Sequence, residues 1–123
     1  MADMRDIAKK RSRDRFIVEV HGTAGLLTEP SRSALLAAVD ECVLNSRHHA
    51  GTEHVDVLLS RSGSCVTVVI SDSGQGFDLL ELPPDSIGVK ESVLARMRDV
   101  GGRASVFSVP GRGTTVLLEA ATP

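Results

Sequence analysis

The sequence has very few aromatic residues. Among its 123 residues there is no tryptophan and no tyrosine, and the phenylalanines are Phe16, Phe77 and Phe107. The core of this chain must therefore be aliphatic, and the stacking platforms on which single-stranded nucleic acids rest are missing. The net charge of -2 gives no general attraction to nucleic acids or to anionic membranes. Direct contact with either is therefore not expected.

Cysteines and long apolar runs are also scarce. Cys42 and Cys65 are the two cysteines of the chain, and isolated thiols of this kind are more often buried and reduced than bridged or metal-bound. No apolar run reaches membrane-spanning length, and the N-terminal residues are too charged for a signal peptide. The expectation that follows is a cytoplasmic domain in a reducing compartment, and the length suits one domain with a modest core.

The apolar pattern predicts an order of strand, helix, two strands, loop, helix and two strands. We expect strands at residues 16–20, 54–59, 65–70, 104–109 and 114–120, and helices at 31–49 and 89–100. Residues 1–15 are interpreted as a frayed helix or linker stub, and residues 78–87 as a mobile loop. The β-branched run 65–70 is expected to be central in the sheet. This order predicts an α+β domain over residues 16–121, with helices on one face of a single sheet.

The predicted helix 31–49 carries polar groups on one face. Glu41, Asn45 and His48 fall within roughly 60° of arc on a helical wheel. Three alanines, Ala34, Ala37 and Ala38, share that arc, and a neighbouring stripe of Leu35, Val39, Cys42 and Val43 is expected to face the core. A carboxylate, an amide and an imidazole on an uncrowded face can hold a metal, a water or a phosphate. The helix alone is equally compatible with an ordinary solvated polar face.

The segment D-S-G-Q-G at residues 72–76 follows a predicted buried strand directly. A carboxylate at this position, Asp72, can accept hydrogen bonds from an exocyclic amine such as that of adenine. Gly74 and Gly76 allow the bare backbone to come close to a ligand. The segment alone also fits an ordinary glycine turn. The phosphate-binding pattern G-x-x-x-x-G-K-S/T is absent from the sequence, and so is a dinucleotide-binding glycine fingerprint.

Two further positions could meet the same ligand. Gly88 is expected to begin the second helix, and a helix N-terminus beside a glycine suits an anion, to which Lys90 would add positive charge. A plain helix start explains Gly88 equally well. Thr114 follows Gly113 at the start of the last strand, and its hydroxyl could reach the ligand of Asp72. Taken alone, this pattern is a hairpin turn.

Together these motifs resemble one family. E-x-x-x-N at residues 41–45, D-x-G-x-G at 72–76, Gly88, and P-G-x-G-T at 110–114 occur in the order found in the Bergerat-fold ATPases. Within that family the chain resembles the catalytic and ATP-binding domain of two-component sensor histidine kinases, over about residues 16–119. The segments 88–102 and 108–116 are similar to actinobacterial kinases that pair with helix-turn-helix response regulators.

The resemblance implies a two-layer α/β sandwich that binds ATP and Mg²⁺. Asn45 would ligate Mg²⁺, Glu41 would act as or position the general base, and Asp72 would bind the adenine amine with support from Thr114. The glycines would let the backbone approach the nucleotide and would hinge a lid at residues 78–87; they are Gly74, Gly76 and Gly88. Relatives often carry Lys or Arg at the position of His48, so a phosphate contact by His48 would depend on pH. His49, next to it, and Lys90 are the other candidates for contact with the phosphates.

The resemblance also implies partners. The acceptor would be a histidine on a separate helical dimerisation domain, a response regulator would act downstream, and a parent kinase could be membrane-anchored. This domain alone is expected to be monomeric and not to phosphorylate itself, because none of its four histidines is followed by an acidic residue. The alternative within the same fold is a free-standing anti-sigma-factor-type serine kinase that binds a sigma factor.

Overall fold

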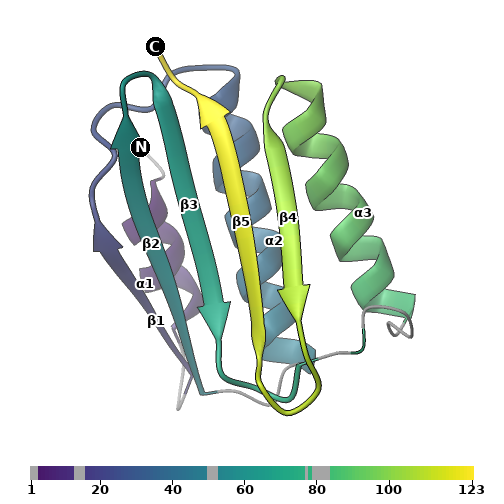
Figure 1. Ribbon diagram of the computed structural model, residues 1–123. Coiled ribbons are helices and arrows are strands. Elements are labelled where there is room, and N and C mark those ends of the chain that lie inside the picture. The colour runs from purple at the N-terminus through teal and green to yellow at the C-terminus, as the bar shows by residue number, and fades with distance from the viewer. Residues whose placement is uncertain (1–2, 13–15, 50–52, 77, 79–83) are drawn as a thin grey trace.

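The fold is a five-stranded sheet covered on one face by three helices (Figure 1). The computed structural model describes residues 3–12, 16–49, 53–76, 78 and 84–123, with the backbone alone for residues 49 and 84–86. The elements in chain order are α1 (Met4–Arg11), β1 (Ile17–Gly22), α2 (Ser31–His49), β2 (His54–Ser62), β3 (Cys65–Asp72), α3 (Pro84–Asp99), β4 (Arg103–Ser108) and β5 (Thr114–Ala121). The predicted α+β sandwich is confirmed.

The sheet is mixed, with the strand order β1-β2-β3-β5-β4. Strands β1 and β2 are parallel, because α2 crosses over between them, and the remaining neighbours are antiparallel. The β-branched strand β3 is central, as predicted. Its last residue, Asp72, is paired with Val55 on one side and with Thr114 on the other. The sheet therefore brings the start of β2, the end of β3 and the start of β5 together at one end.

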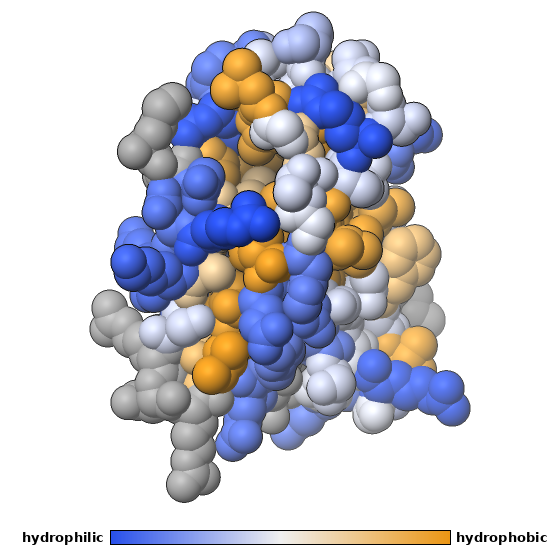
Figure 2. Space-filling view, turned by 90° about the vertical axis from the view of Figure 1, so that its left-hand side faces the viewer, coloured by the Kyte–Doolittle hydropathy of each residue, from blue (hydrophilic) through white to orange (hydrophobic). Residues whose placement is uncertain are grey.

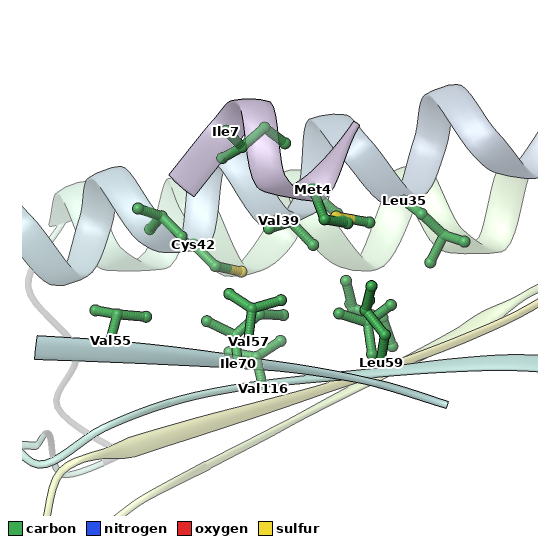
Figure 3. Close-up of a cluster of buried hydrophobic side chains, with 14 of the residues drawn as sticks. Met4, Ile7, Leu35, Val39, Cys42, Val55, Val57, Leu59, Ile70 and Val116 are labelled. Carbon is green, nitrogen blue, oxygen red and sulfur yellow. The ribbon is translucent and has the colours of Figure 1, made fainter. Parts of the chain in front are cut away.

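The core lies between the sheet and the helices (Figure 3). Alternate residues of the strands point into it, and the predicted stripe of α2 is buried against them: Leu35, Val39, Cys42 and Val43. Ala38 belongs to this core too, because it is fully buried. The expectation that Ala38 lies on the open polar face of the helix is therefore wrong, since that face is narrower than a helical wheel suggests.

The N-terminal segment forms a packed helix. Asp3 caps α1 through its side chain, which accepts a hydrogen bond from the backbone N–H of Asp6 at 2.9 Å, and Asp6 returns a contact of 3.0 Å. Three apolar side chains are buried against the domain, namely Met4, Ile7 and Ala8. The interpretation of residues 1–15 as a frayed helix or linker stub is wrong for residues 4–11, because i, i+3, i+4 spacing gives this short helix an apolar face.

Several element boundaries differ from the prediction. α3 begins at Pro84, so the predicted loop residues 84–87 form its first turn, and proline suits this position because its fixed φ is already helical. Phe77 and residues 79–83 of the predicted loop region lie outside the described residues. β1 continues through His21 to Gly22, because both residues pair with β2.

The far end of the sheet is held by one arginine. Arg61 donates hydrogen bonds to the carbonyl oxygens of Ala24 at 2.6 Å, Leu26 at 2.5 Å and Thr122 at 2.7 Å. These bonds tie the connection between β1 and α2 to the C-terminal residues. Among the described residues, no helix is long and apolar enough to cross a membrane.

Candidate functional site

The candidate site lies where α2 passes the end of β3 and the start of β5. Asp72 and Thr114 are direct partners across these two strands. Ser46 of α2 donates a hydrogen bond from its hydroxyl to Asp72 Oδ2 at 2.8 Å, which links the helix to this end of the sheet. Asn45 is the neighbour of Ser46 in α2, and Glu41 lies one turn earlier. The structure thus brings the predicted residues of α2, β3 and β5 to one end of the domain.

The Asp72 carboxylate is held by three donors of the protein. Besides the Ser46 hydroxyl, the backbone N–H of Gly74 donates to Oδ1 at 3.0 Å and that of Thr114 at 3.3 Å. An ionised carboxylate can accept about four hydrogen bonds. The carboxylate is half-buried and fixed in orientation, and one acceptor position is left for a donor from outside the protein. It is therefore a preorganised acceptor for an amine.

Glycines let the loop after β3 pack against the β4–β5 hairpin. Gly76 has a φ of +67°, and a Cβ there would overlap the carbonyl oxygen of Val109. Gly113 has a φ of +85°, and a Cβ there would overlap the carbonyl oxygen of Asp72. The backbone N–H of Gly111 donates to the carbonyl of Gln75 at 2.5 Å. Loop and hairpin packing alone thus requires glycine at position 76.

Asn45 carries a buried polar atom without a partner. Its side chain is half-buried, and Oδ1 has no hydrogen-bond partner among the described residues. A buried amide oxygen left unpaired costs free energy, so such an atom in a native site calls for a ligand. A neutral hard oxygen is a ligand type that Mg²⁺ accepts. The residues present therefore fit a magnesium ion at Asn45.

Glu41 is engaged by the neighbouring helix. Its Oε1 accepts hydrogen bonds from the Ser92 hydroxyl at 3.0 Å and from Arg96 Nε at 2.5 Å, and both donors belong to α3. The Glu41 side chain is 25% exposed and that of Arg96 is 46% exposed. Both contacts go to the same carboxylate oxygen. The residue expected to act as a base is therefore also part of the contact between α2 and α3.

The predicted phosphate-binding residues are placed unevenly. His48 is exposed on the last turn of α2, and the side chain of His49 lies outside the described residues. Lys90 is half-buried on α3. Gly88 is exposed inside α3 rather than at its start, and beyond its own helical turns no described atom lies within 4 Å of a Cβ built there. The expectation that Gly88 begins the helix is therefore wrong, because α3 starts at Pro84. Its contact with a ligand stays a prediction.

The two thiols have different environments. Burial raises the pKa of the Cys42 thiol to about 12, and the neighbouring Glu41 charge adds to the effect. Cys65 is exposed at the start of β3, so the expectation of burial holds for Cys42 and is wrong for Cys65. Both are free cysteines, as expected. Cys42 contributes to the core beneath the site as a small apolar group.

Sequence reasoning missed three site residues, Ser46, Ser92 and Arg96. Ser46 interrupts the apolar stripe of α2, and a polar side chain on a core-facing stripe needs a hydrogen-bond partner. The position of Ser46 on this stripe could therefore have indicated a buried hydrogen bond, and the structure shows that its partner is Asp72. Ser92 and Arg96 are four residues apart on α3 and share one face. Nothing in the sequence indicated that this face meets Glu41, because the contact depends on how α2 and α3 pack.

Comparison with known proteins shows the family to which the sequence of this chain belongs. The profile of the histidine kinase-, DNA gyrase B- and HSP90-like ATPases matches residues 31–122. DegS of Brevibacillus brevis, a signal transduction histidine-protein kinase/phosphatase, is 35% identical over 88 residues, which are 69% of this chain and 22% of DegS. The sensor histidine kinase LiaS of Bacillus subtilis is 32% identical over 82 residues, 67% of this chain and 22% of LiaS.

Solved structures share the fold. The ATP binding domain of PrrB from Mycobacterium tuberculosis has a TM-score of 0.71 at 20% identity and covers 99% of this chain and 96% of that one. The histidine kinase domain of the blue-light activated kinase of Erythrobacter litoralis has a TM-score of 0.73 at 21% identity, with 94% and 59% covered. This chain spans about a fifth of the length of the curated relatives DegS and LiaS. It belongs to the histidine kinase-, DNA gyrase B- and HSP90-like ATPase family.

Proposed function

We propose that this chain is the ATP-binding catalytic domain of a sensor histidine kinase. It would bind Mg-ATP and supply the γ-phosphoryl group to a histidine on a separate phosphoacceptor and dimerisation domain, from which a response regulator takes it. The observation that carries this proposal is the buried Oδ1 of Asn45, which has no hydrogen-bond partner in the part of the chain that the structure describes. Asn45 is one residue from Ser46, which orients Asp72. The named histidine kinases among its relatives support the same assignment.

Asp72 and Thr114 would bind the base of the nucleotide. Three protein donors fix the Asp72 carboxylate, and its remaining acceptor position suits the exocyclic amine of adenine. The Thr114 hydroxyl lies 2.8 Å from that of Ser108, so it is held at the start of β5 beside this acceptor. Gly74 would contribute by orienting Asp72 through its N–H, and Gly76 by closing the loop against the hairpin.

Asn45 would hold the magnesium ion through Oδ1. When bound, Mg²⁺ neutralises phosphate charge and orients the phosphates. His48, His49 and Lys90 would contact the phosphates from the ends of α2 and α3. Phosphoryl transfer depends mainly on positioning and on neutralising charge, and this set of side chains can supply both.

Glu41 would act on the acceptor histidine as a general base or by orienting its imidazole. To do so, it must exchange its contact with Arg96 for one with the incoming domain, since both compete for the same carboxylate. The chain alone would therefore bind ATP without phosphorylating itself. Such a domain would be monomeric and would work in the cytoplasm, where ATP is supplied.

Calorimetric titration with ATP tests the proposal. We expect Asp72→Asn to weaken ATP binding about tenfold or more, because an amide places a donor opposite the adenine amine. Asn45→Ala should weaken binding in MgCl₂ and leave it nearly unchanged in EDTA. Asp99→Asn, an exposed carboxylate at the end of α3, is the matched control and should bind like the parent chain.

Thermal unfolding of each variant separates loss of binding from loss of folding. Unchanged ATP affinity in a folded Asp72→Asn variant would contradict the adenine assignment. An equal loss of affinity for Asn45→Ala with and without magnesium would show that Asn45 supports the fold instead of the metal.

A further inference from the structure

Two histidines and two carboxylates meet on the sheet face away from α2. β1 contributes Glu19 and His21, which are two residues apart and so point to the same side of the strand. β2 contributes His54 and Asp56 in the same way, and Glu19 is the direct partner of Asp56 across the parallel pair. The valines between them, Val20 and Val55, pack on or in the core, which places all four polar side chains on the other face of the sheet.

The ligand atoms of this cluster converge. His21 Nε2 lies 2.7 Å and His54 Nε2 lies 2.9 Å from the same oxygen, Asp56 Oδ1. Glu19 Oε2 is 3.9 Å from His21 Nε2, and Glu19 Oε1 is 3.7 Å from His54 Nε2. The ligand atoms of Glu19, His21 and Asp56 all lie within 4.8 Å of one another. Both imidazoles thus direct the same ring nitrogen to one point.

These distances suit a tetrahedral metal ion. Nitrogen and oxygen ligands at about 2.0–2.1 Å from zinc are separated from each other by about 3.4 Å. Four of the six separations in such a site, 2.7, 2.9, 3.7 and 3.9 Å, lie on both sides of this value, with Glu19 using Oε2 toward His21 and Oε1 toward His54. Three of the residues, Glu19, His21 and Asp56, already converge, and His54 would join them as the fourth ligand. Small side-chain rotations on binding would bring these separations closer to the tetrahedral value, while the paired strands keep the four residues adjacent.

The ligand types select the metal. Two imidazoles disfavour Mg²⁺ and Ca²⁺, which take oxygen ligands, whereas a set of two nitrogens and two carboxylate oxygens in tetrahedral arrangement is typical of zinc. The side of the molecule that carries β1 shows hydrophilic and hydrophobic areas next to each other (Figure 2). The side chains of the cluster are 42–52% exposed, which leaves them accessible.

We propose that Glu19, His21, His54 and Asp56 form a zinc site that joins β1 to β2. This site does not depend on the proposed kinase function, because it lies on the opposite face of the sheet from Asn45 and Glu41. Bound zinc would connect the edge strand β1, which has a single neighbour in the sheet, to β2 by ligands from both strands. Because the ion binds the paired strands and not the unfolded chain, it would raise the stability of the domain.

Titration of the complete chain with ZnCl₂ in a non-chelating buffer tests the site. We expect one zinc ion per chain and no binding of MgCl₂ in the same range by the cluster. The double variant His21→Gln and His54→Gln should lose at least about a hundredfold in zinc affinity, since two of four ligands are removed. His21 is exposed and His54 is half-buried with its side chain outside the core, so this variant should keep the circular dichroism spectrum of the parent chain.

Two controls exclude other ligands, namely the exposed thiol and the histidine on α2. Cys65→Ser and His48→Gln should each change zinc affinity by less than about threefold. A second readout is thermal unfolding, in which zinc should raise the melting temperature of the parent chain and leave that of the double variant unchanged. Absence of stoichiometric zinc binding by the parent chain, or equal affinity in the double variant, would overturn the proposal.

Discussion

Two adjacent carboxylates on α2, those of Asp40 and Glu41, bind arginines of different helices and do so in different ways. Asp40 faces α1, where Arg11 binds it through two hydrogen bonds of 2.7 and 2.9 Å. Glu41 faces α3, where Arg96 and Ser92 both bind a single carboxylate oxygen. Arg11 is 19% exposed and Arg96 is 46% exposed. The Asp40 pair uses both carboxylate oxygens with the less exposed arginine, whereas the Glu41 pair uses one oxygen with the more exposed arginine. The two carboxylate side chains are similarly exposed, 30% for Asp40 and 25% for Glu41.

The difference separates a structural ion pair from an exchangeable one. A two-pronged arginine–carboxylate pair fixes orientation, and Arg11 lowers the pKa of the Asp40 carboxyl by hydrogen bonding and charge. A contact to one oxygen from an exposed side chain is weaker and easily replaced. The α1 side of α2 therefore holds its carboxylate through two bonds for stability, and on the α3 side the single-oxygen contact of Glu41 can be exchanged for the acceptor under the proposed function.

The largest expected effect is a difference between Glu41 and Asp40 in the rate of phosphoryl transfer. With a cognate phosphoacceptor domain added in trans, Glu41→Gln should lower the transfer rate about a hundredfold or more and leave ATP affinity nearly unchanged. Asp40→Asn, the matched control one residue away, should keep the rate within about twofold. Transfer of label from γ-labelled ATP measures both. Similar rates for the two variants would show that Glu41 has no role in transfer.

The second prediction compares the two arginines in unfolding experiments. Arg11→Ala should lower the free energy of unfolding by about 1–2 kcal/mol, because it breaks a bidentate pair and detaches α1 from α2. Arg96→Ala should lower it by less than about 1 kcal/mol. Urea denaturation followed by circular dichroism gives both values. A larger loss for Arg96→Ala than for Arg11→Ala would reverse the assignment of the structural pair.

The smallest expected effect is the pH dependence of the stability that the Arg11–Asp40 pair contributes. The pKa of Asp40 is lower in the folded chain than in the unfolded one, so the pair stabilises the fold above the unfolded pKa, about 3.9, and this stabilisation is lost as the pH falls through the folded value. The stability difference between the parent chain and Asp40→Asn should be constant from pH 5 to 7 and shrink below about pH 4. Arg11→Ala should show the same loss of acid dependence, and a difference that persists at pH 2 would contradict this account.

The elements of the fold were largely readable from the sequence. The bounds of α2 agree with the prediction at both ends, because proline and serine precede its apolar stripe and a glycine follows it. Central placement of β3 followed from its β-branched composition. The packing of α1 on the domain was not predicted, because the many charged residues of this segment outweigh its three apolar side chains in the sequence pattern. Those three side chains are buried, and this packing stabilises the helix. The start of α3 was misplaced because Pro83-Pro84 was taken as loop, although proline is favoured in a first helical turn.

The sequence predicted which residues lie at the site better than it predicted the contacts between them. Motif order brought Asp72, Thr114 and Asn45 together, and the sheet register joins the first two directly. The support of Asp72 by Ser46 and the contact of Glu41 with Arg96 depend on how helices pack on strands and on each other. Sequence periodicity fixes the face on which a side chain lies, but it does not fix the element that this face meets.

The packing of the segment after β3 against the β4–β5 hairpin has a thermodynamic consequence. Gly76 and Gly113 pack so closely on the opposing backbone that a Cβ on either would overlap a carbonyl oxygen, so contacts within the protein itself hold these two chain segments together. Fixing one backbone residue costs about 1–2 kcal/mol of conformational entropy. Around Asp72 the backbone is already fixed when the chain folds. A base that bound there would therefore lose little affinity to the conformational entropy of ordering the protein. The entropy of binding would instead be determined by the side of the ligand that meets α2 and α3.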